Sequence, residues 1–258
     1  MTIRRSTALF FVLLSVLPFA AAAQDRPFAF AFSPAAWDRN GALFFFQPAY
    51  GDAASAAIAR DGLESRVGFE ARMTGRVLLL ADMGFASSGS ESATTYHAEV
   101  FYSLLEGKDR PFHLALGSGM RREDEGVAVW LGRLVAEHVR ESGRLLGDLR
   151  FEKAFDSDRD EIDAILTLAA ARTFGHGFSG GFEVLGEDLE ALWTPNEAEG
   201  GARLLVGPSV HWIRSDRRLL ATLAGGPVFR FNANDQASAA PRDLGNGYVV
   251  RASVACVF

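Results

Sequence analysis

The 258-residue sequence is poor in three features that would each point to a class of protein. Cysteine occurs once, as Cys256, so neither a disulfide framework nor a cysteine-based metal site can form within the chain. Lysine occurs only twice, against 24 arginines, and the formal net charge is −6. Nothing in this acidic sequence resembles a basic stripe of the kind that binds nucleic acid. Beyond the first 23 residues there is no run of about eighteen apolar residues, which excludes a transmembrane helix there.

The beginning of the chain has the pattern of a secretory signal peptide. Arg4 and Arg5 precede an apolar run over residues 8–19, and small residues follow up to Ala23. The apolar run is shorter than the roughly 20 residues that span a bilayer, which favours a signal peptide that is cleaved after Ala23. The residue directly after that position is Gln24 and not cysteine, so a lipid anchor is not expected. We therefore divide the chain into a signal peptide (1–23), a lead-in segment (24–41) and a folded domain (42–258).

The folded domain alternates between apolar and polar residues with a period of two. In the segment LESRVGFEARM, residues 63–73, the charged side chains Glu64, Arg66, Glu70 and Arg72 share one face, and the other face is mainly apolar. This period is typical of β-strands with one polar and one apolar side. A soluble sandwich would show the same alternation, so the strands alone do not distinguish water from lipid.

The connections between the strands favour a barrel. We expect twelve strands, over residues 42–50, 63–73, 76–86, 94–105, 111–120, 127–139, 144–155, 161–173, 177–187, 200–213, 218–231 and 247–258. Every second connection is tight, such as TG at 74–75 and FGHG at 174–177, and most of the others are longer. Short turns at one end, longer loops at the other and an even number of strands predict a transmembrane, antiparallel, up-and-down β-barrel. Ten and fourteen strands are the alternatives.

With its signal peptide, its amphipathic strands and the ending YVVRASVACVF, the chain resembles bacterial outer-membrane β-barrel proteins. The resemblance implies a location in the outer membrane of a Gram-negative bacterium, contact with outer-membrane lipid, and no cofactor. It also implies that the barrel-assembly machinery recognises the C-terminal strand through the terminal aromatic residue, Phe258. Cys256 stands where that class usually has a second aromatic.

The polar faces of the strands predict a charged lumen that contains seven acids, seven arginines and one histidine. These residues are Glu64, Arg66, Glu70, Arg72, Asp82, His97, Glu99, Arg133, Asp148, Arg150, Glu152, Glu183, Arg203, Arg230 and Arg251. They would line a narrow aqueous path, as in a passive, porin-like channel for small solutes, or they would pair across strands and fill a structural or surface-interaction barrel. The balance of charge argues against strong ion selectivity.

An outer-membrane lipid hydrolase is a further alternative. It needs a nucleophile, a histidine and an orienting group within hydrogen-bond reach. Ser209 and His211 share one strand face, and so do His97 and Glu99. Residues two apart on a strand are about 6.5–7 Å apart, so such a site would need a third strand. We expect no enzymatic activity.

Three segments outside the strands are less determined. Phe28, Phe30 and Phe32 alternate, which suits either an added β-segment or a periplasmic lead-in. The DSDRDE segment, residues 156–161, has acidic residues at the spacing of a calcium loop, but Glu161 stands where such a loop requires glycine. We expect a solvated acidic loop there. The role of the loop over residues 187–200, with Leu189, Leu192 and Trp193, is open.

Overall fold

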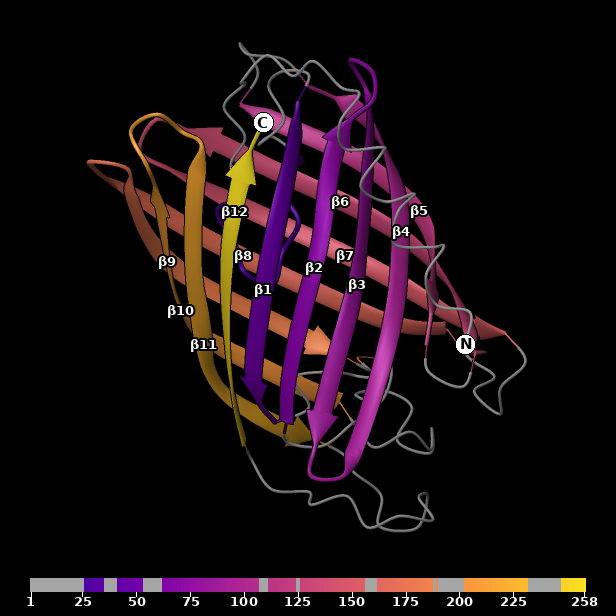
Figure 1. Ribbon diagram of the computed structural model, residues 1–258. Coiled ribbons are helices and arrows are strands. Elements are labelled where there is room, and N and C mark those ends of the chain that lie inside the picture. Colours follow the sequence, from indigo (N-terminus) through magenta and orange to yellow (C-terminus); the bar gives the residue numbers. More distant parts are fainter. Residues whose placement is uncertain are drawn as a thin grey trace.

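Twelve antiparallel strands form the wall of the molecule in a computed structural model (Figure 1). The structure describes residues 26–34, 41–52, 62–106, 111–123, 126–155, 162–187, 189, 202–231 and 247–258. The strands are β1 (Ala42–Gly51), β2 (Gly62–Arg72), β3 (Val77–Ser88), β4 (Glu91–Leu105), β5 (Phe112–Arg122), β6 (Ala128–Arg140), β7 (Gly143–Phe155), β8 (Ile162–Gly175), β9 (Phe178–Glu187), β10 (Ala202–Ile213), β11 (Leu219–Phe231) and β12 (Gly247–Val257). The predicted fold class and strand number are confirmed.

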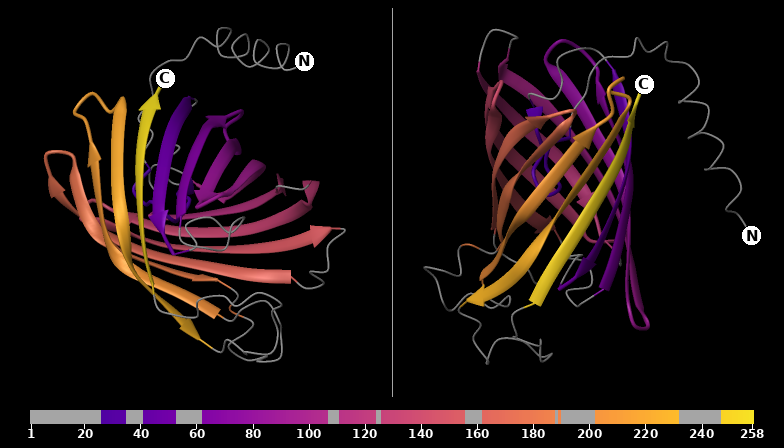
Figure 2. Two further views of the ribbon diagram at one scale, coloured as in Figure 1. Left: turned by 60° about the horizontal axis from the view of Figure 1, so that its bottom comes forward. Right: turned by 90° about the vertical axis from the view of Figure 1, so that its left-hand side faces the viewer.

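The wall closes because the first strand pairs with the last. Each strand pairs with its neighbours in sequence, and β1 also pairs with β12, with Leu43 opposite Val257. The N–H of Phe258 donates a hydrogen bond of 2.9 Å to the carbonyl oxygen of Ala42 beyond the last strand pair. Figure 2 shows the tilted strands wrapping around the closed barrel. Closure leaves no strand edge unpaired, as a wall surrounded by hydrocarbon requires.

The two faces of each strand differ as the period of two in the sequence predicts. In β12 the side chains of Tyr248, Val250 and Val254 are exposed on the outside, whereas Val249 and Ser253 are buried on the inside. The outer surface is therefore largely apolar, and most polar side chains point into the barrel. No helix in the described part of the chain is long and apolar enough to cross a membrane.

The two ends of the barrel differ in their connections. The described turns over 73–76, 141–142, 176–177 and 214–218 lie at the end where β12 finishes, here called the short-turn end. The turn at 176–177 is a two-residue hairpin in which His176 and Gly177 both have positive φ, at 53° and 79°. In the turn over 214–218, hydrogen bonds from the Arg214 side chain and the Arg218 N–H lower the pKa of Asp216 to about 2.

The opposite end, here called the long-loop end, contains one turn that is tighter than expected. The segment SSGSESA was predicted to be a loop, but β3 continues to Ser88 and β4 begins at Glu91. Only residues 89 and 90 form the turn, with Gly89 at a φ of 59°. Its small and polar residues suggested a loop. The residue pattern of one segment does not show whether that segment pairs with a neighbouring strand, and here the pairing extends to the Ser88–Glu91 pair.

Candidate functional site

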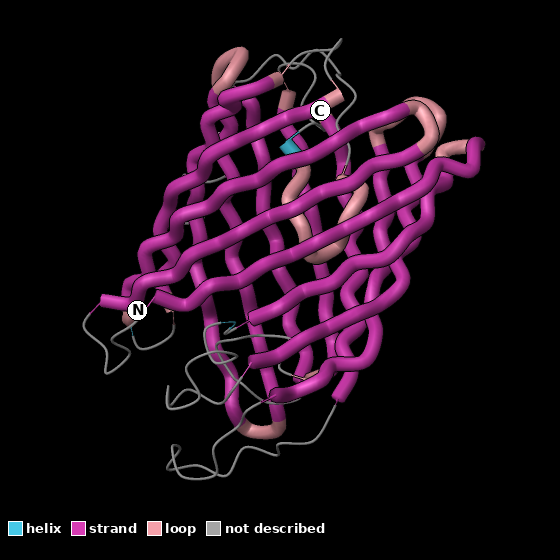
Figure 3. Tube along the Cα trace, turned by 180° about the vertical axis from the view of Figure 1, so that it is seen from behind, coloured by secondary structure: helices cyan, strands magenta, loops and turns pink. Residues whose placement is uncertain are grey.

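Residues 26–34 lie inside the barrel, where they form what we call the interior loop (Figure 3). Phe28, Ala31 and Phe32 are buried and belong to one cluster with inward-facing wall residues. The loop contains no β-strand. The two sequence-based alternatives, an added β-segment and a lead-in outside the barrel, therefore do not describe these residues, which instead fill part of the lumen.

Carboxylates on the wall bind the backbone of the interior loop. The N–H groups of Ala29 and Phe30 donate to the two oxygens of Glu183, at 2.9 and 2.8 Å. The N–H of Phe32 donates to Asp148 at 3.0 Å, and the Ser33 hydroxyl donates to Glu137 at 2.7 Å. A segment without secondary structure can be buried only if its polar backbone groups find partners. Glu183 and Asp148 supply partners for the backbone, and Glu137 supplies one for the Ser33 side chain.

Wall side chains also donate to carbonyl groups of the loop and bind its Arg26 side chain. The Gln47 amide donates to the Ala29 oxygen at 2.9 Å, and the Thr222 hydroxyl donates to the Arg26 oxygen at 2.8 Å. The Arg26 guanidinium lies 3.2 Å from Glu70 and 4.0 Å from the centre of the Phe45 ring. The interior loop is therefore bound at both its backbone and its side chains.

Aromatic packing adds to this binding. The rings of Phe32 and Phe101 are stacked, with centroids 4.2 Å apart. Gly117, opposite Phe101 on β5, leaves the space that this ring occupies, because a Cβ atom there would lie 2.6 Å from the ring. Gly68 leaves the corresponding space for Phe45. Glycines on the inner wall thus make room for the rings that hold the loop.

The interior loop fills the half of the barrel nearest the short-turn end. Its first contact, Glu70, lies near the short-turn end of β2, and its last, Glu137, lies near the short-turn end of β6. Its middle contacts, Asp148 and Glu183, lie nearer the centre of β7 and β9. The loop therefore enters the barrel and turns back toward the same end.

Beyond the loop, toward the long-loop end, lies a cavity of about 80 Å³ that we call the arginine chamber. Phe30 of the interior loop contributes to its lining, together with Asp148 and Glu187 from the wall. Six arginines line it, namely Arg66, Arg121, Arg133, Arg150, Arg203 and Arg251. The chamber is thus a polar compartment bounded on one side by the loop.

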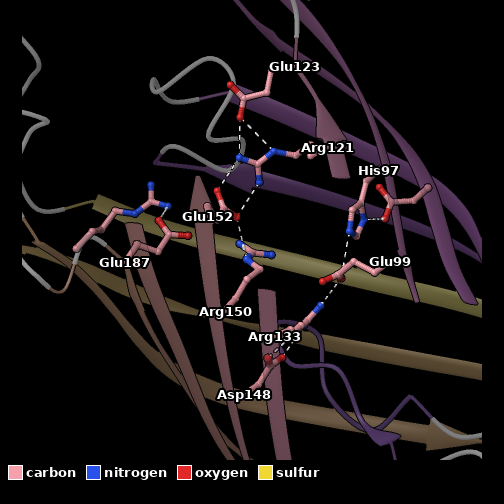
Figure 4. A network of polar contacts seen from close by, with 11 residues as sticks. His97, Glu99, Arg121, Glu123, Arg133, Asp148, Arg150, Glu152 and Glu187 are labelled. Atoms are coloured by element: carbon pink, nitrogen blue, oxygen red, sulfur yellow. Dashed lines mark hydrogen bonds and ion pairs between the residues drawn. The ribbon is translucent and has the colours of Figure 1, made fainter. Parts of the chain in front are cut away.

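Two ion-pair networks fix most of these arginines to the wall (Figure 4). In the first, Arg133 donates to both oxygens of Asp148, at 2.7 and 2.6 Å, and to Glu99 at 2.9 Å. Glu99 also lies 3.1 Å from His97, whose other ring nitrogen lies 2.7 Å from Asp82. This chain of contacts joins the interior loop, which Asp148 binds, to Asp82 on β3.

The second network lies closer to the long-loop end. Arg121 bridges Glu123 and Glu152, at 2.6 and 2.7 Å, and Arg150 lies 2.9 Å from Glu152. Arg203 pairs with Glu187. In Figure 4 the side chains of Arg121, Glu152 and Arg150 lie one after another in space, with Glu187 to one side.

The two signs of charge are not equally accessible. The side chains of Arg66 and Arg150 are 28% and 25% exposed, whereas their partners Glu64 and Glu152 are 2% and 5% exposed. In these two pairs the carboxylate lies against the wall and the guanidinium group faces the chamber, whereas the side chain of Glu187 is 21% exposed and that of its partner Arg203 is 17% exposed. Because six arginines and two acids line the chamber, a solute in it meets mainly positive charge.

Comparison with known proteins supports the fold. Neither a family model nor a curated protein sequence matches the chain. Among solved structures, a KdgM porin is 13% identical with a TM-score of 0.56, over 84% of this chain and 99% of that chain. A NanC porin is 10% identical with a TM-score of 0.57, over 83% and 98%. The chain has the fold of the outer-membrane porins.

A second KdgM structure, a porin in complex with disordered oligogalacturonate, has a TM-score of 0.55 at 12% identity, over 84% of this chain and 99% of that chain. Identities this low establish the porin fold and not a shared solute. The resemblance to outer-membrane β-barrels that the sequence suggested is confirmed as a resemblance of fold.

Within this porin fold, the fifteen residues predicted for the lumen all lie on inward-facing strand positions. The first network brings Asp82, His97, Glu99, Arg133 and Asp148 together. Others lie apart from it, such as Glu70 and Arg72 toward the short-turn end and Arg230, which pairs with Asp52 at 2.6 Å. Arg251 lies 4.6 Å from the ring centre of Phe30 in the interior loop.

The sequence reasoning missed several interior residues, and three of the charged ones follow the alternation of their strands. Arg121 continues the inward alternation of β5, but the strand had been ended at residue 120. Glu187, the last residue of β9, has the same parity as Glu183, and Glu137 has the same parity as Arg133 on β6. Extending the alternation to the end of every strand would have found all three.

The histidines proposed for a hydrolase bind other groups. Nδ1 of His211 lies 3.0 Å from the Thr222 hydroxyl, which in turn donates to the interior loop. Ser209 is buried in the wall. His97 lies between Asp82 and Glu99 in the first network. The acidic loop 156–161 and the residues Leu192 and Trp193 lie outside the described residues, as do the signal peptide and its cleavage site.

Proposed function

We propose that the protein is a porin-like barrel of the bacterial outer membrane that admits small solutes from the long-loop end and prefers anions. We propose also that the interior loop closes the path toward the short-turn end. The observation that carries this proposal is the arginine chamber, a polar cavity inside a closed barrel of porin fold and next to the loop. By the usual orientation of such barrels, the short-turn end faces the periplasm.

The preference for anions follows from the unequal exposure of the charges. Arg66 and Arg150 present their guanidinium groups to the chamber, and the acids that hold them are covered. Guanidinium groups bind carboxylates and phosphates with two parallel hydrogen bonds. We expect a modest preference, because the covered acids still reduce the positive potential. The KdgM porin solved with oligogalacturonate, a polyanion, is consistent with such a lumen.

Passage through the barrel requires the interior loop to move. Glu183, Asp148 and Glu137 bind its backbone or its Ser33 hydroxyl, and Phe32 is stacked on the wall. A barrel that never releases the loop would be the structural or surface-interaction protein that the sequence left as an alternative. The state of the loop therefore distinguishes the two functions.

Conductance in planar bilayers tests the proposal. The full-length barrel should show little or brief conductance, and a variant in which residues 26–34 are replaced by a glycine-serine linker of equal length should conduct steadily. In a KCl gradient, the reversal potential of that variant should show more chloride than potassium current. Adding Arg66→Gln and Arg150→Gln should shift the reversal potential toward zero, and Arg214→Gln, in an exposed turn, should not.

Two results would contradict the proposal. If the linker variant is folded and still silent, the barrel is not a channel and the structural alternative is favoured. If the unmodified barrel conducts as well as the linker variant, the interior loop does not close the path.

A further inference from the structure

The outer surface of the barrel is hollowed where β6, β7, β8 and β9 approach the short-turn end. Two adjoining depressions there have volumes of about 470 and 540 Å³ and share His138, Leu145, Ala170 and Phe182. Because they share these residues, they form one groove that runs along the wall. We call it the outer groove.

The pairing register explains why the wall is hollow there. In one row of outward-facing residues, His138, Leu145, Ala170 and Phe182 lie side by side on the four strands. In the next row toward the long-loop end, Gly147 lies between Ala136 and Leu168. The small residues Ala136, Gly147 and Ala170 form the floor, next to the larger Leu145 and Phe182. A groove between bulky apolar residues thus results directly from the sequence.

The end of the groove carries two arginines. In the row closest to the turns, Arg140 and Arg172 lie on either side of Gly143. Neighbouring strands are about 4.8 Å apart, so the two Cα atoms are roughly 10 Å apart with bare backbone between them. Arg140 also contacts the His138 ring, at 2.9 Å. The turn adds one acid, Glu141, so this end of the groove remains positively charged.

We propose that the outer groove is a binding site for an anionic phospholipid, with an acyl chain on the apolar floor and the phosphate between Arg140 and Arg172. The inference goes beyond the proposed solute path and shares with it only the location in a membrane. Charge complementarity supports this occupant. The apolar rows end in two cations at the end of the strands, where hydrocarbon gives way to headgroups, and arginine binds phosphate with a bidentate fork. A second copy of the barrel packed on the groove would have to bury both cations.

Native mass spectrometry of the full-length barrel in detergent, with added phosphatidylglycerol, tests this site. The unmodified barrel should retain one phosphatidylglycerol, and it should retain less of a diacylglycerol with the same chains, which lacks the phosphate. The double variant with Arg140→Gln and Arg172→Gln should bind phosphatidylglycerol about tenfold more weakly. A control with Arg76→Gln and Arg218→Gln, exposed arginines in other short turns, should bind normally.

A second variant tests the apolar part of the groove. A Cβ atom at Gly147 would have its nearest neighbour, a Leu168 methyl group, at 3.7 Å, so Gly147→Leu should fold and fill the floor. It should lose the lipid although both arginines remain. Equal lipid retention in all variants would overturn the proposal. So would a dimer that Gly147→Leu dissociates without changing the lipid count, because that result assigns the groove to a second copy. Neither outcome depends on conductance.

Discussion

At the scale of single residues, Arg133 connects the charged network of the wall to the interior loop. It binds Asp148 and Glu99 and lies 5.4 Å from the Phe32 ring centre in the interior loop. Both acids are buried, so water cannot replace Arg133 as their partner. Asp148 also accepts the Phe32 N–H, which means that one side chain orders both the wall and the loop.

Replacing Arg133 should therefore be costly. Arg133→Met leaves two buried carboxylates without their main partner, and breaking a buried ion pair in this way costs about 3–5 kcal/mol. Urea-induced unfolding from lipid vesicles would measure the loss. A triple variant that adds Glu99→Gln and Asp148→Asn should recover most of it, because the unpaired charges are then gone. Unfolding of Arg133→Met at the same urea concentration as the unmodified barrel would show that the network contributes little.

At the scale of elements, Glu183 is the wall side chain that binds two successive backbone N–H groups of the interior loop, those of Ala29 and Phe30. Glu183→Ala leaves both donors without this acceptor, so the loop should leave the lumen more often. The readout is the rate at which Ala31→Cys, buried in the unmodified loop, reacts with a membrane-impermeant maleimide. The background carries Cys256→Ala, since Cys256 is exposed.

The labelling rate should rise at least about tenfold, since hydrogen bonds to a charged group contribute about 1.5–3 kcal/mol each. Glu123→Ala, which removes an acid that contacts Arg121 just beyond the end of β5, serves as the control. A loop that reacts at the same slow rate in Glu183→Ala would be held by its aromatic contacts instead.

The strands and the interior loop differ in how far the sequence predicts them. Each strand repeats its own apolar and polar alternation, so most observed ends lie within a few residues of the expected ones. The loop has no such internal signal. Phe28, Phe30 and Phe32 alternate like a strand, but their position depends on Glu183 and Asp148, which are more than a hundred residues away in sequence. Which of the predicted lumen charges meet is likewise set by the register between strands, and a single sequence does not give that register.

At the scale of the whole molecule, the pairing of β1 with β12 is the step that makes a barrel out of a sheet. Leu43 and Val257 pair at the short-turn end, and Gly51 and Val249 pair near the other. At Gly51, φ is 128° and a Cβ atom would lie 2.0 Å from the Tyr248 oxygen, so any larger residue would disturb this seam. The contacts of the interior loop depend on closure, because they reach strands all around the barrel, namely β1, β6, β7, β9 and β11.

Phe258 lies at the short-turn end of this seam, and we predict that it matters for assembly more than for the stability of the finished barrel. Its N–H bonds to Ala42, a backbone contact that Phe258→Ala retains, and its side chain is 50% exposed on the outside. Removing an exposed ring should therefore cost the folded state little. The resemblance to outer-membrane barrels implies that the assembly machinery recognises this ring. Phe258→Ala should thus lower the amount of heat-modifiable, folded barrel in outer-membrane fractions several-fold, yet refold normally into lipid vesicles. Phe231→Ala, which removes a ring that is 44% exposed at the end of β11, is the matched control and should assemble normally. Equal assembly of the two variants would remove any special role for Phe258, and a refolding defect of Phe258→Ala in vesicles would assign its effect to the seam itself.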